Sequence, residues 1–204
     1  VVSRIDRVFE KRLAAVINSG ERRVLQGGRR GVEKESLRVN PAGRIASTPH
    51  PQALGSALTN DHITTDYSEA LIELVTPTFN TNWELLQYLC DLHQFVYRHL
   101  GDELLWATSM PCVVDGDASI PIAQYGPSNV GRMKTIYREG LGIRYGRVMQ
   151  AISGVHFNYS FPERLWPIWA AARESRDEGQ DFVSDSYFDL LRNYRRYGWI
   201  VLYL

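Results

Sequence analysis

Two glutamates stand two positions apart in the apolar segment of residues 31–39, Gly-Val-Glu-Lys-Glu-Ser-Leu-Arg-Val. The pattern predicts a β-strand, and because side chains alternate along a strand, Glu33 and Glu35 would share one face. Leu37 and Val39 continue that face, which should therefore be partly buried. Two carboxylates about 7 Å apart on such a face lose hydration and repel each other, so they either take up protons or hold a cation between them. Carboxylate oxygens suit Mg²⁺ or Mn²⁺; the alternative is an edge strand with two solvated glutamates.

A third glutamate lies in residues 63–77, whose β-branched content and final Pro77 indicate extended backbone. Glu73 would share a face with Leu71 and Val75. A carboxylate between two apolar neighbours costs free energy unless it is paired. Glu73 therefore either joins a cationic site or meets one of the chain's arginines.

Residues 148–161 alternate between apolar and polar side chains, which predicts another strand. One face would carry Gln150, His156 and Asn158 and could form the wall of a site. The other face is expected to be well packed, and it consists of Met149, Ala151, Val155, Phe157, Tyr159 and Phe161. His156 is either a metal ligand through a neutral imidazole nitrogen or a half-exposed strand histidine. Gly154 would let a ligand or another backbone approach closely.

Apolar residues at helical spacing predict the elements that hold these segments in place. Helices are expected over residues 3–18, 82–100, 128–146 and 162–173, and from about Ser184 onward. Ser128 or Asn129 can cap the third helix. The same region is basic and could meet phosphates or a substrate carboxylate, or simply form a solvated face; it carries Arg132, Lys134, Arg138, Arg144 and Arg147. Residues 40–62 and 106–127 are expected to be loops, the second of them long and ordered.

The composition bounds the class of protein. The 204 residues suffice for one domain with a sizeable core, and 44% hydrophobic and 23% charged residues are ordinary for a soluble globular protein. A formal net charge of 0 gives no sign of a nucleic-acid or anionic-membrane partner, and no apolar run reaches membrane-spanning length. Cys90 and Cys112 lack metal-ligand spacing and fit a reducing cytoplasm. The chain stops inside an apolar run, residues 198–204, so we expect it to be a piece of a longer protein.

Eight short motifs follow one another along the chain. They are residues 31–39, 48–51 (Thr-Pro-His-Pro), 54–59, 63–71, 109–112 (Ser-Met-Pro-Cys), 123–126, 133–141 and 152–160. Together they resemble the proteobacterial type of glutamate–cysteine ligase, in the family's order and over nearly the whole chain. Because that family is considerably longer than 204 residues, the resemblance implies its N-terminal portion.

The resemblance implies an ATP-dependent ligase that makes γ-glutamylcysteine, the first step of glutathione biosynthesis. ATP would phosphorylate the side-chain carboxylate of L-glutamate, and the amine of L-cysteine would attack the γ-glutamyl phosphate. The implied fold is α+β, a glutamine-synthetase-like antiparallel β-sheet funnel with flanking helices, incomplete in this chain. Residues 1–204 would be the N-terminal part of a single catalytic domain. The implied cofactors are ATP and Mg²⁺ (or Mn²⁺).

The same resemblance assigns roles to residues of this chain. Its metal residues would be Glu33, Glu35, Asp66, Glu73 and His156, and of these Glu33, Glu35, Glu73 and His156 would also be catalytic. Nucleotide or phosphate contacts would come from Arg138, His156 and Asn158, and the cysteine pocket from Tyr67, Tyr137, Leu141 and Gln150. Tyr67 stands where phenylalanine also occurs in relatives, which keeps an aromatic wall and adds a hydroxyl.

Two further hypotheses stay open beside the ligase. One is a truncated, catalytically incomplete fragment that folds and binds metal; the other is a related carboxylate–amine ligase that uses another amine. The expected partners are the small molecules glutamate, cysteine and ATP, without nucleic acid or membrane, and a monomeric full-length form is left open. The 204-residue piece alone is expected to be inactive and to be poorly soluble or oligomeric, because its apolar end would be bare.

Overall fold

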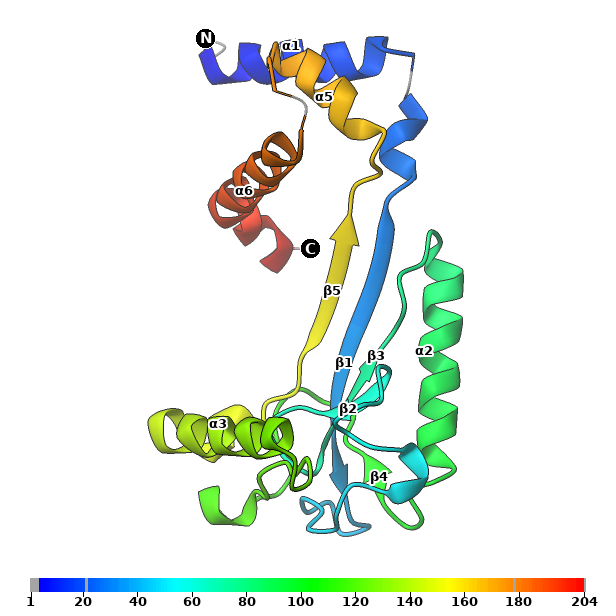
Figure 1. Cartoon of the computed structure of the whole chain (residues 1–204), viewed down its shortest axis with the longest axis vertical. Helices are drawn as coiled ribbons and strands as arrows, with labels where there is room; N and C mark the ends of the chain where they lie inside the picture. The colour runs from blue at the N-terminus through cyan, green and yellow to red at the C-terminus, as the bar shows by residue number, and fades with distance from the viewer. Residues whose placement is uncertain (1–3, 21, 178, 204) are drawn as a thin grey trace. The chain divides into compact units, whose positions relative to one another are not determined.

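The computed structural model describes residues 4–20, 22–177 and 179–203, and the chain divides into two compact units. The larger unit is Arg29–Tyr159, and the smaller unit combines Val1–Gly28 with Ser160–Leu204. Figure 1 shows the helices and strands of both. That the whole chain forms part of one catalytic domain stays a prediction.

The larger unit is built on a five-stranded sheet whose central strand is β1 (Arg29–Val39). Its other strands are β2 (Ile63–Thr65), β3 (Leu71–Val75), β4 (Leu104–Leu105) and β5 (Val155–Ser160). β1 pairs antiparallel with β3 and β4, β3 pairs antiparallel with β2, and β5 also pairs with β1. The strand over residues 31–39 is confirmed. Because β1 has neighbours on both sides, it is no edge strand, and the alternative of two solvated edge glutamates is wrong.

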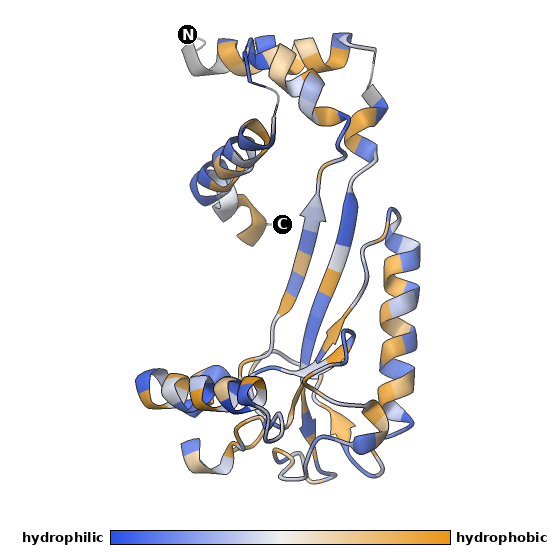
Figure 2. Cartoon of the chain, in the orientation of Figure 1, coloured by the Kyte–Doolittle hydropathy of each residue, from blue (hydrophilic) through white to orange (hydrophobic). Residues whose placement is uncertain are grey.

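Apolar side chains cover the two faces of this sheet differently. On one face Ile72 and Leu74 pack with Val96 and Leu100, which belong to α2 (Asn82–Tyr97) and the turn after it. On the other face, toward the β4 end of β1, a second cluster contains Leu37, Val39, Leu71, Tyr67 and Ile120. Burial of each such aliphatic side chain contributes roughly 1.5–3 kcal/mol. β3 and β4 are mostly apolar (Figure 2). The first face is thus closed by a helix, while part of the second is left for polar residues.

The predicted helix over residues 128–146 is confirmed as α3 (Asn129–Tyr145). Ser128 caps it, because its hydroxyl accepts a hydrogen bond from Gly131 N at 3.1 Å. The long loop before it is ordered, as predicted, and contains only the short helix η3 (Asp117–Ser119). Backbone bonds such as Ala123 N to Tyr67 O, 3.1 Å, fasten this loop to the β2–β3 turn.

The smaller unit is helical. It contains α1 (Arg4–Asn18), η1 (Arg22–Gln26), α5 (Leu165–Arg173), α6 (Gln180–Tyr197) and η4 (Gly198–Leu202). Trp166 packs its ring against Phe161 and Tyr187. The predicted helices are confirmed, although α6 begins four residues before Ser184, and residue 3 lies outside the described residues. The apolar side chains of the final run are exposed, among them Trp199, Val201 and Tyr203; Leu204 lies outside the described residues. Within the described residues, no helix has the length and apolar character needed to cross a membrane.

Two predictions about strands need correction. Residues 63–77 form a hairpin, not one extended segment, because the chain turns between Thr65 and Leu71. Residues 147–150 form the short helix α4 (Arg147–Gln150), since the Asp117 carboxylate accepts hydrogen bonds from Arg147 N at 2.9 Å and Val148 N at 3.1 Å. Gln150 therefore comes from a helix. β5 starts only at Val155, and its apolar face is not packed: the exposed fractions are 63% for Val155 and 61% for Phe157.

Candidate functional site

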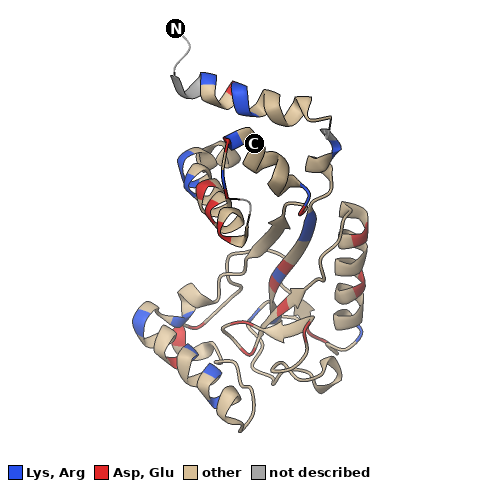
Figure 3. Cartoon of the chain, turned by 45° about the horizontal axis from the view of Figure 1, so that its top comes forward, with Lys and Arg blue, Asp and Glu red and all other residues tan. Residues whose placement is uncertain are grey.

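Three glutamates lie on one face of the sheet. Glu35 is directly opposite Glu73 in the β1–β3 pairing, and Glu33 is one step of the alternation further along β1. All three residues are half-buried. Figure 3 shows acidic residues along the middle of β1 and β3. The predicted shared face of Glu33 and Glu35 is confirmed, and the register adds Glu73 to it.

Asp66 supplies a fourth carboxylate from the turn between β2 and β3. Burial, followed by the charges of Asp66, Glu35 and Glu33, raises the pKa of Glu73 to about 7, with His156 opposing. Burial also raises the pKa of Glu35; the hydrogen bond from Gly154 opposes this rise, and the charge of Asp66 adds to it. Among the described residues, the ion pairs include none between Glu73 and an arginine, so the alternative that Glu73 meets an arginine is wrong.

These four carboxylates carry the kind of oxygen ligands that bind a hard divalent cation. Four carboxylates offer oxygen ligands of the type that Mg²⁺ and Mn²⁺ take, and a bound cation would reverse the rise in the pKa of Glu73. Within the part of the chain that the structure describes, no three His, Cys, Asp or Glu side chains already stand in an arrangement that could hold a metal ion. The cluster is therefore a set of charges that share a face, not a finished coordination shell.

β5 brings a histidine and an asparagine to the same carboxylates. Asn158 Nδ2 donates to Glu33 Oε1 at 2.9 Å, and His156 Nδ1 lies 3.3 Å from Glu33 Oε2. The His156 side chain is 59% exposed, which leaves its ring accessible. The predicted wall of His156 and Asn158 is thus next to Glu33. Gln150, the third residue of that wall, lies on α4.

Gly154 lies where backbone and side chains meet closely. Its N–H donates to Glu35 Oε2 at 2.7 Å, and Glu35 N donates to its carbonyl at 3.0 Å. A Cβ at this position would lie 3.3 Å from His156 Nε2 and 3.5 Å from Glu35 Oε2. The predicted approach of another backbone to this glycine is confirmed by the Glu35 N–H, and the side chains nearest to it are those of His156 and Glu35.

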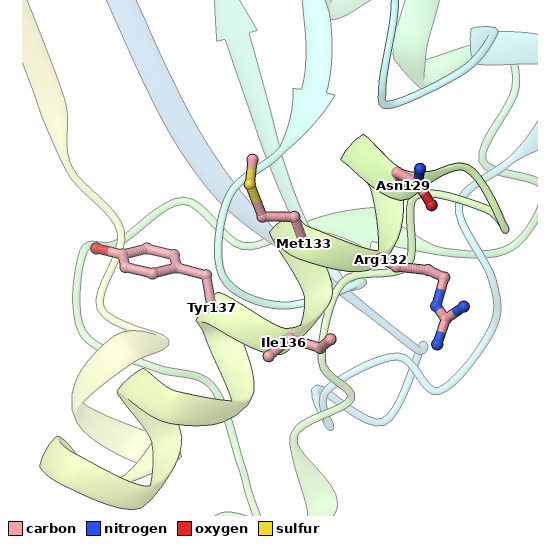
Figure 4. A pocket seen from close by; sticks show the side chains of 5 residues that line it. All are labelled: Asn129, Arg132, Met133, Ile136 and Tyr137. Carbon is pink, nitrogen blue, oxygen red and sulfur yellow. The ribbon is translucent and has the colours of Figure 1, made fainter.

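The four residues assigned to a cysteine pocket are dispersed over two environments. Tyr67 is 1% exposed and lies in the second core cluster, and a side chain at Gly142 of α3 would collide with its hydroxyl. Leu141 packs against the same cluster. Tyr137 is 64% exposed and, with four other α3 side chains, lines a shallow hollow (Figure 4). The structure brings Tyr67 and Leu141 together, and it leaves Tyr137 on the surface of the helix.

Arg138 makes its contacts within the chain. Its Nε donates to Asp66 O, its Nη1 donates to Lys134 O at 3.0 Å, and its guanidinium carbon lies 4.7 Å from the centre of the Tyr125 ring. Nη2 takes no part in these bonds. A contact between Arg138 and a phosphate would therefore use Nη2 or the second N–H of Nη1, and it stays a prediction.

Two residues of the site's surroundings were not predicted. Arg38, fully buried on β1, pairs with Glu103 at 2.6 Å and donates to the carbonyls of Thr48 and Glu69. The sequence feature that could have revealed the buried Arg38 is its place between Leu37 and Val39, in a strand that is otherwise apolar there. Tyr125, buried in the long loop, shares its hydroxyl proton between Thr65 O at 2.8 Å and Asp66 O at 3.1 Å, and no sequence pattern marks that role.

The fold and the site together define an α+β protein whose antiparallel sheet presents carboxylates, a histidine and an asparagine on one face. The family model for glutamate-cysteine ligase matches residues 13–204. The chain belongs to the glutamate–cysteine ligase family. The predicted resemblance is confirmed.

Individual relatives agree with this. The glutamate–cysteine ligase of Alcanivorax borkumensis is 52% identical over 196 residues, which are 96% of this chain and 37% of that protein. The glutamate–cysteine ligase of Pseudomonas putida is 53% identical over 174 residues, or 85% of this chain and 33% of that protein. The chain thus spans about a third of the length of these relatives.

Solved structures show the same fold. A glutamate–cysteine ligase from Francisella tularensis, in complex with AMP, has a TM-score of 0.80 and 41% identity over 87% of this chain and 34% of its own. A bifunctional glutathione synthetase from Pasteurella multocida has a TM-score of 0.79 and 32% identity over 93% of this chain and 25% of its own. The predicted fold class, an α+β antiparallel sheet with flanking helices, is confirmed.

Proposed function

We propose that the protein carrying this chain joins the side-chain carboxylate of glutamate to the amine of cysteine. ATP would be consumed, γ-glutamyl phosphate would be the intermediate, and γ-glutamylcysteine would be the product. The observation that carries the proposal is that a chain of this family gathers Glu33, Glu35, Asp66 and Glu73 at one sheet face, where the pKa of Glu73 rises to about 7. Phosphoryl transfer to a carboxylate brings negative groups together, and such a face could hold the cations that this requires.

Glu33, Glu35, Asp66 and Glu73 would hold Mg²⁺ or Mn²⁺, with His156 beside them. When bound, the cation would neutralise charge on the phosphates and on the reacting carboxylate. The residues of the chain prepare for this. Asn158 orients Glu33 through its amide, and Gly154 orients Glu35 through its backbone N–H. Held in this way, the two carboxylates cannot turn away from the face when a cation arrives.

The side chains beside the carboxylates are the candidates for contacts with the nucleotide and the substrates. The Francisella tularensis relative was solved with AMP, and we infer that an adenine nucleotide binds here too. His156 and Asn158 would contact its phosphates, because both lie at Glu33 and the His156 ring is accessible. Tyr67, Tyr137, Leu141 and Gln150 would belong to the pocket for cysteine. A cytoplasmic location and a monomeric full-length form stay predictions.

Isotope transfer tests the proposed reaction in the full-length enzyme. Glutamate labelled with ¹⁸O in its side-chain carboxylate should pass one ¹⁸O to the released phosphate, because the C–O bond of the γ-glutamyl phosphate breaks when the amine attacks. Product formation should require ATP, glutamate and cysteine together. Unlabelled phosphate would contradict the acyl phosphate, and a preference for an amine other than cysteine would favour a related ligase.

Replacing His156 by alanine should impair catalysis and leave the fold intact. We expect kcat/KM for ATP to fall about 10- to 100-fold, a typical loss for a group at the edge of a metal site. The change in the free energy of unfolding should stay within about 0.5 kcal/mol, because the side chain is largely exposed. His99→Ala is the control, since its ring bonds to Phe95 O beside α2. Normal ATP turnover in His156→Ala would make His156 an ordinary strand histidine.

Replacing Leu141 by alanine should weaken discrimination between cysteine and the slightly larger amine 2-aminobutyrate. The two amines differ by a methyl group in place of the thiol, and an apolar pocket discriminates such similar groups weakly, so the ratio of the two kcat/KM values should shift modestly, by less than about 10-fold. Leu141 also packs against the core, so some loss of stability is expected. Leu86→Ala, at an exposed position of α2, serves as the control. An unchanged ratio would remove Leu141 from the pocket.

A further inference from the structure

The backbone of Asp66 is held firmly, while its side chain stays half-exposed. Asp66 N donates to Leu71 O at 3.1 Å, which closes the turn between β2 and β3. Asp66 O accepts two hydrogen bonds, one from the Tyr125 hydroxyl at 3.1 Å and one from Arg138 Nε. A carbonyl oxygen has two lone pairs, so both are used. The two peptide groups that flank the Asp66 Cα are therefore both held by hydrogen bonds.

Tyr125 is itself locked in place. It is 6% exposed, and its single hydroxyl proton is shared between Thr65 O at 2.8 Å and Asp66 O at 3.1 Å. Thr65 Oγ1 donates to the same hydroxyl at 3.2 Å. Its ring lies 4.7 Å from the Arg138 guanidinium and 5.0 Å from the Lys134 ammonium. Arg138 Nη1 in turn bonds to Lys134 O in α3. Tyr125 of the long loop and Arg138 of α3 thus both contact the carbonyl of Asp66 in the β2–β3 turn.

The turn needs such support. Residues 66–70, Asp-Tyr-Ser-Glu-Ala, contain no glycine or proline that would fix their backbone angles. The Asp66 carboxylate nevertheless lies close enough to Glu35 and Glu73 to raise the pKa of both. Like charges tend to move apart, so the proximity has to be maintained by contacts elsewhere.

We propose that Tyr125 and Arg138 are positioning residues. They fix the carbonyl of Asp66 and thereby keep its carboxylate beside Glu35 and Glu73, on the sheet face proposed to bind the cation. This inference rests on the proposed function. Neither side chain touches the cation; both act through Asp66. Tyr125 lies near the end of the long loop between β4 and α3, so this part of the loop would support the Asp66 carboxylate.

Mn²⁺ binding to the full chain tests this inference, read from the electron paramagnetic resonance signal of free Mn²⁺. Tyr125→Phe keeps the ring and its cationic neighbours and removes only the hydroxyl. We expect its Mn²⁺ dissociation constant to rise about 10-fold, as for other residues that orient metal ligands. Arg138→Lys keeps the charge, removes Nε and should have a similar effect. Tyr187→Phe is the matched control, since its hydroxyl accepts a bond from Phe161 N in the other unit.

Repeating the Tyr125→Phe change in an Asp66→Asn variant distinguishes a positioning role for Tyr125 from a general loss of stability. In Asp66→Asn, which itself should bind Mn²⁺ more weakly, adding Tyr125→Phe should cause no further loss, because the group it positions is already gone. An equal loss in both backgrounds, or wild-type affinity in Tyr125→Phe and Arg138→Lys, would overturn the inference and leave the proposed function standing. If Asp66→Asn alone binds Mn²⁺ like the wild type, the metal role of Asp66 fails, and this inference fails with it. Circular dichroism on every variant confirms that it is folded.

Discussion

The change Glu35→Gln should abolish ligase activity in the full-length enzyme while preserving the fold. Glu35 lies between Glu33 and Glu73 on the carboxylate face, and its Oε2 accepts the Gly154 N–H at 2.7 Å. Glutamine keeps the shape and still offers a carbonyl oxygen to Gly154, so the local backbone should stay in place. It loses the negative charge. A cation that stabilises charge in the transition state is worth several kcal/mol, so we expect turnover to fall on the order of 100-fold or more.

The same variant should respond less to metal. Mg²⁺ or Mn²⁺ should raise the melting temperature of the wild-type protein, since a ligand that binds only the folded state stabilises it. This rise should be smaller in Glu35→Gln. Glu10→Gln, at an exposed position of α1, is the control and should behave as the wild type. Wild-type activity in Glu35→Gln would remove this residue from the site.

The change Glu73→Gln should make the metal-free protein more stable at alkaline pH. The pKa of Glu73 is about 7 in the folded chain against an ordinary value of 4.5, so folding favours the protonated form. The stability gained from that proton is present below about pH 4.5 and is lost as the pH rises through about 7. Glutamine resembles the protonated side chain and does not titrate. After a discount for solvent screening, we expect Glu73→Gln to exceed the wild type by on the order of 1–3 kcal/mol at pH 8 and to match it near pH 4.5.

Urea unfolding with a chelator present, at pH 4.5 and at pH 8, measures this difference. Glu10→Gln is again the control, because it also removes one carboxylate but at an exposed position. Added Mg²⁺ should reverse the order at pH 8, because only the wild type has the complete carboxylate set. Equal stability of Glu73→Gln and the wild type at both pH values would show that Glu73 is not crowded by the other carboxylates.

Local periodicity predicted the part of the site that lies on β1. Glu33 and Glu35 share a face because alternation holds along an uninterrupted strand, and β1 runs without a break from Arg29 to Val39. The pairing of Glu35 with Glu73 depends on the long-range register between β1 and β3, and β3 begins after the β2–β3 turn. That turn has no glycine or proline to reveal it. Ser68 ties this turn to the long loop, since its hydroxyl donates to Pro121 O at 2.8 Å.

The predictions from local sequence failed where contacts between distant parts of the chain determine the structure. The alternation through Met149 and Ala151 is regular, yet Asp117, thirty residues earlier in the chain, caps a helical turn at Arg147. The burial of Tyr67 likewise depends on α3 passing over it at Gly142. Neither contact leaves a trace in local sequence spacing. Family resemblance supplied the roles of Asp66 and the cysteine pocket, which the residues alone did not indicate.

Cation binding to the carboxylate face tests the central claim most directly. Titration with Mn²⁺ at pH 8, followed by electron paramagnetic resonance, should show saturable binding that weakens as the pH falls below about 7, because Glu73 then takes up a proton and stops being a ligand. Replacing Glu33, Glu35 and Glu73 together by glutamine should abolish this binding. If Mn²⁺ binds the triple variant as tightly as the wild type, or binds the wild type equally well at pH 5 and pH 8, the carboxylate face is not the cation site.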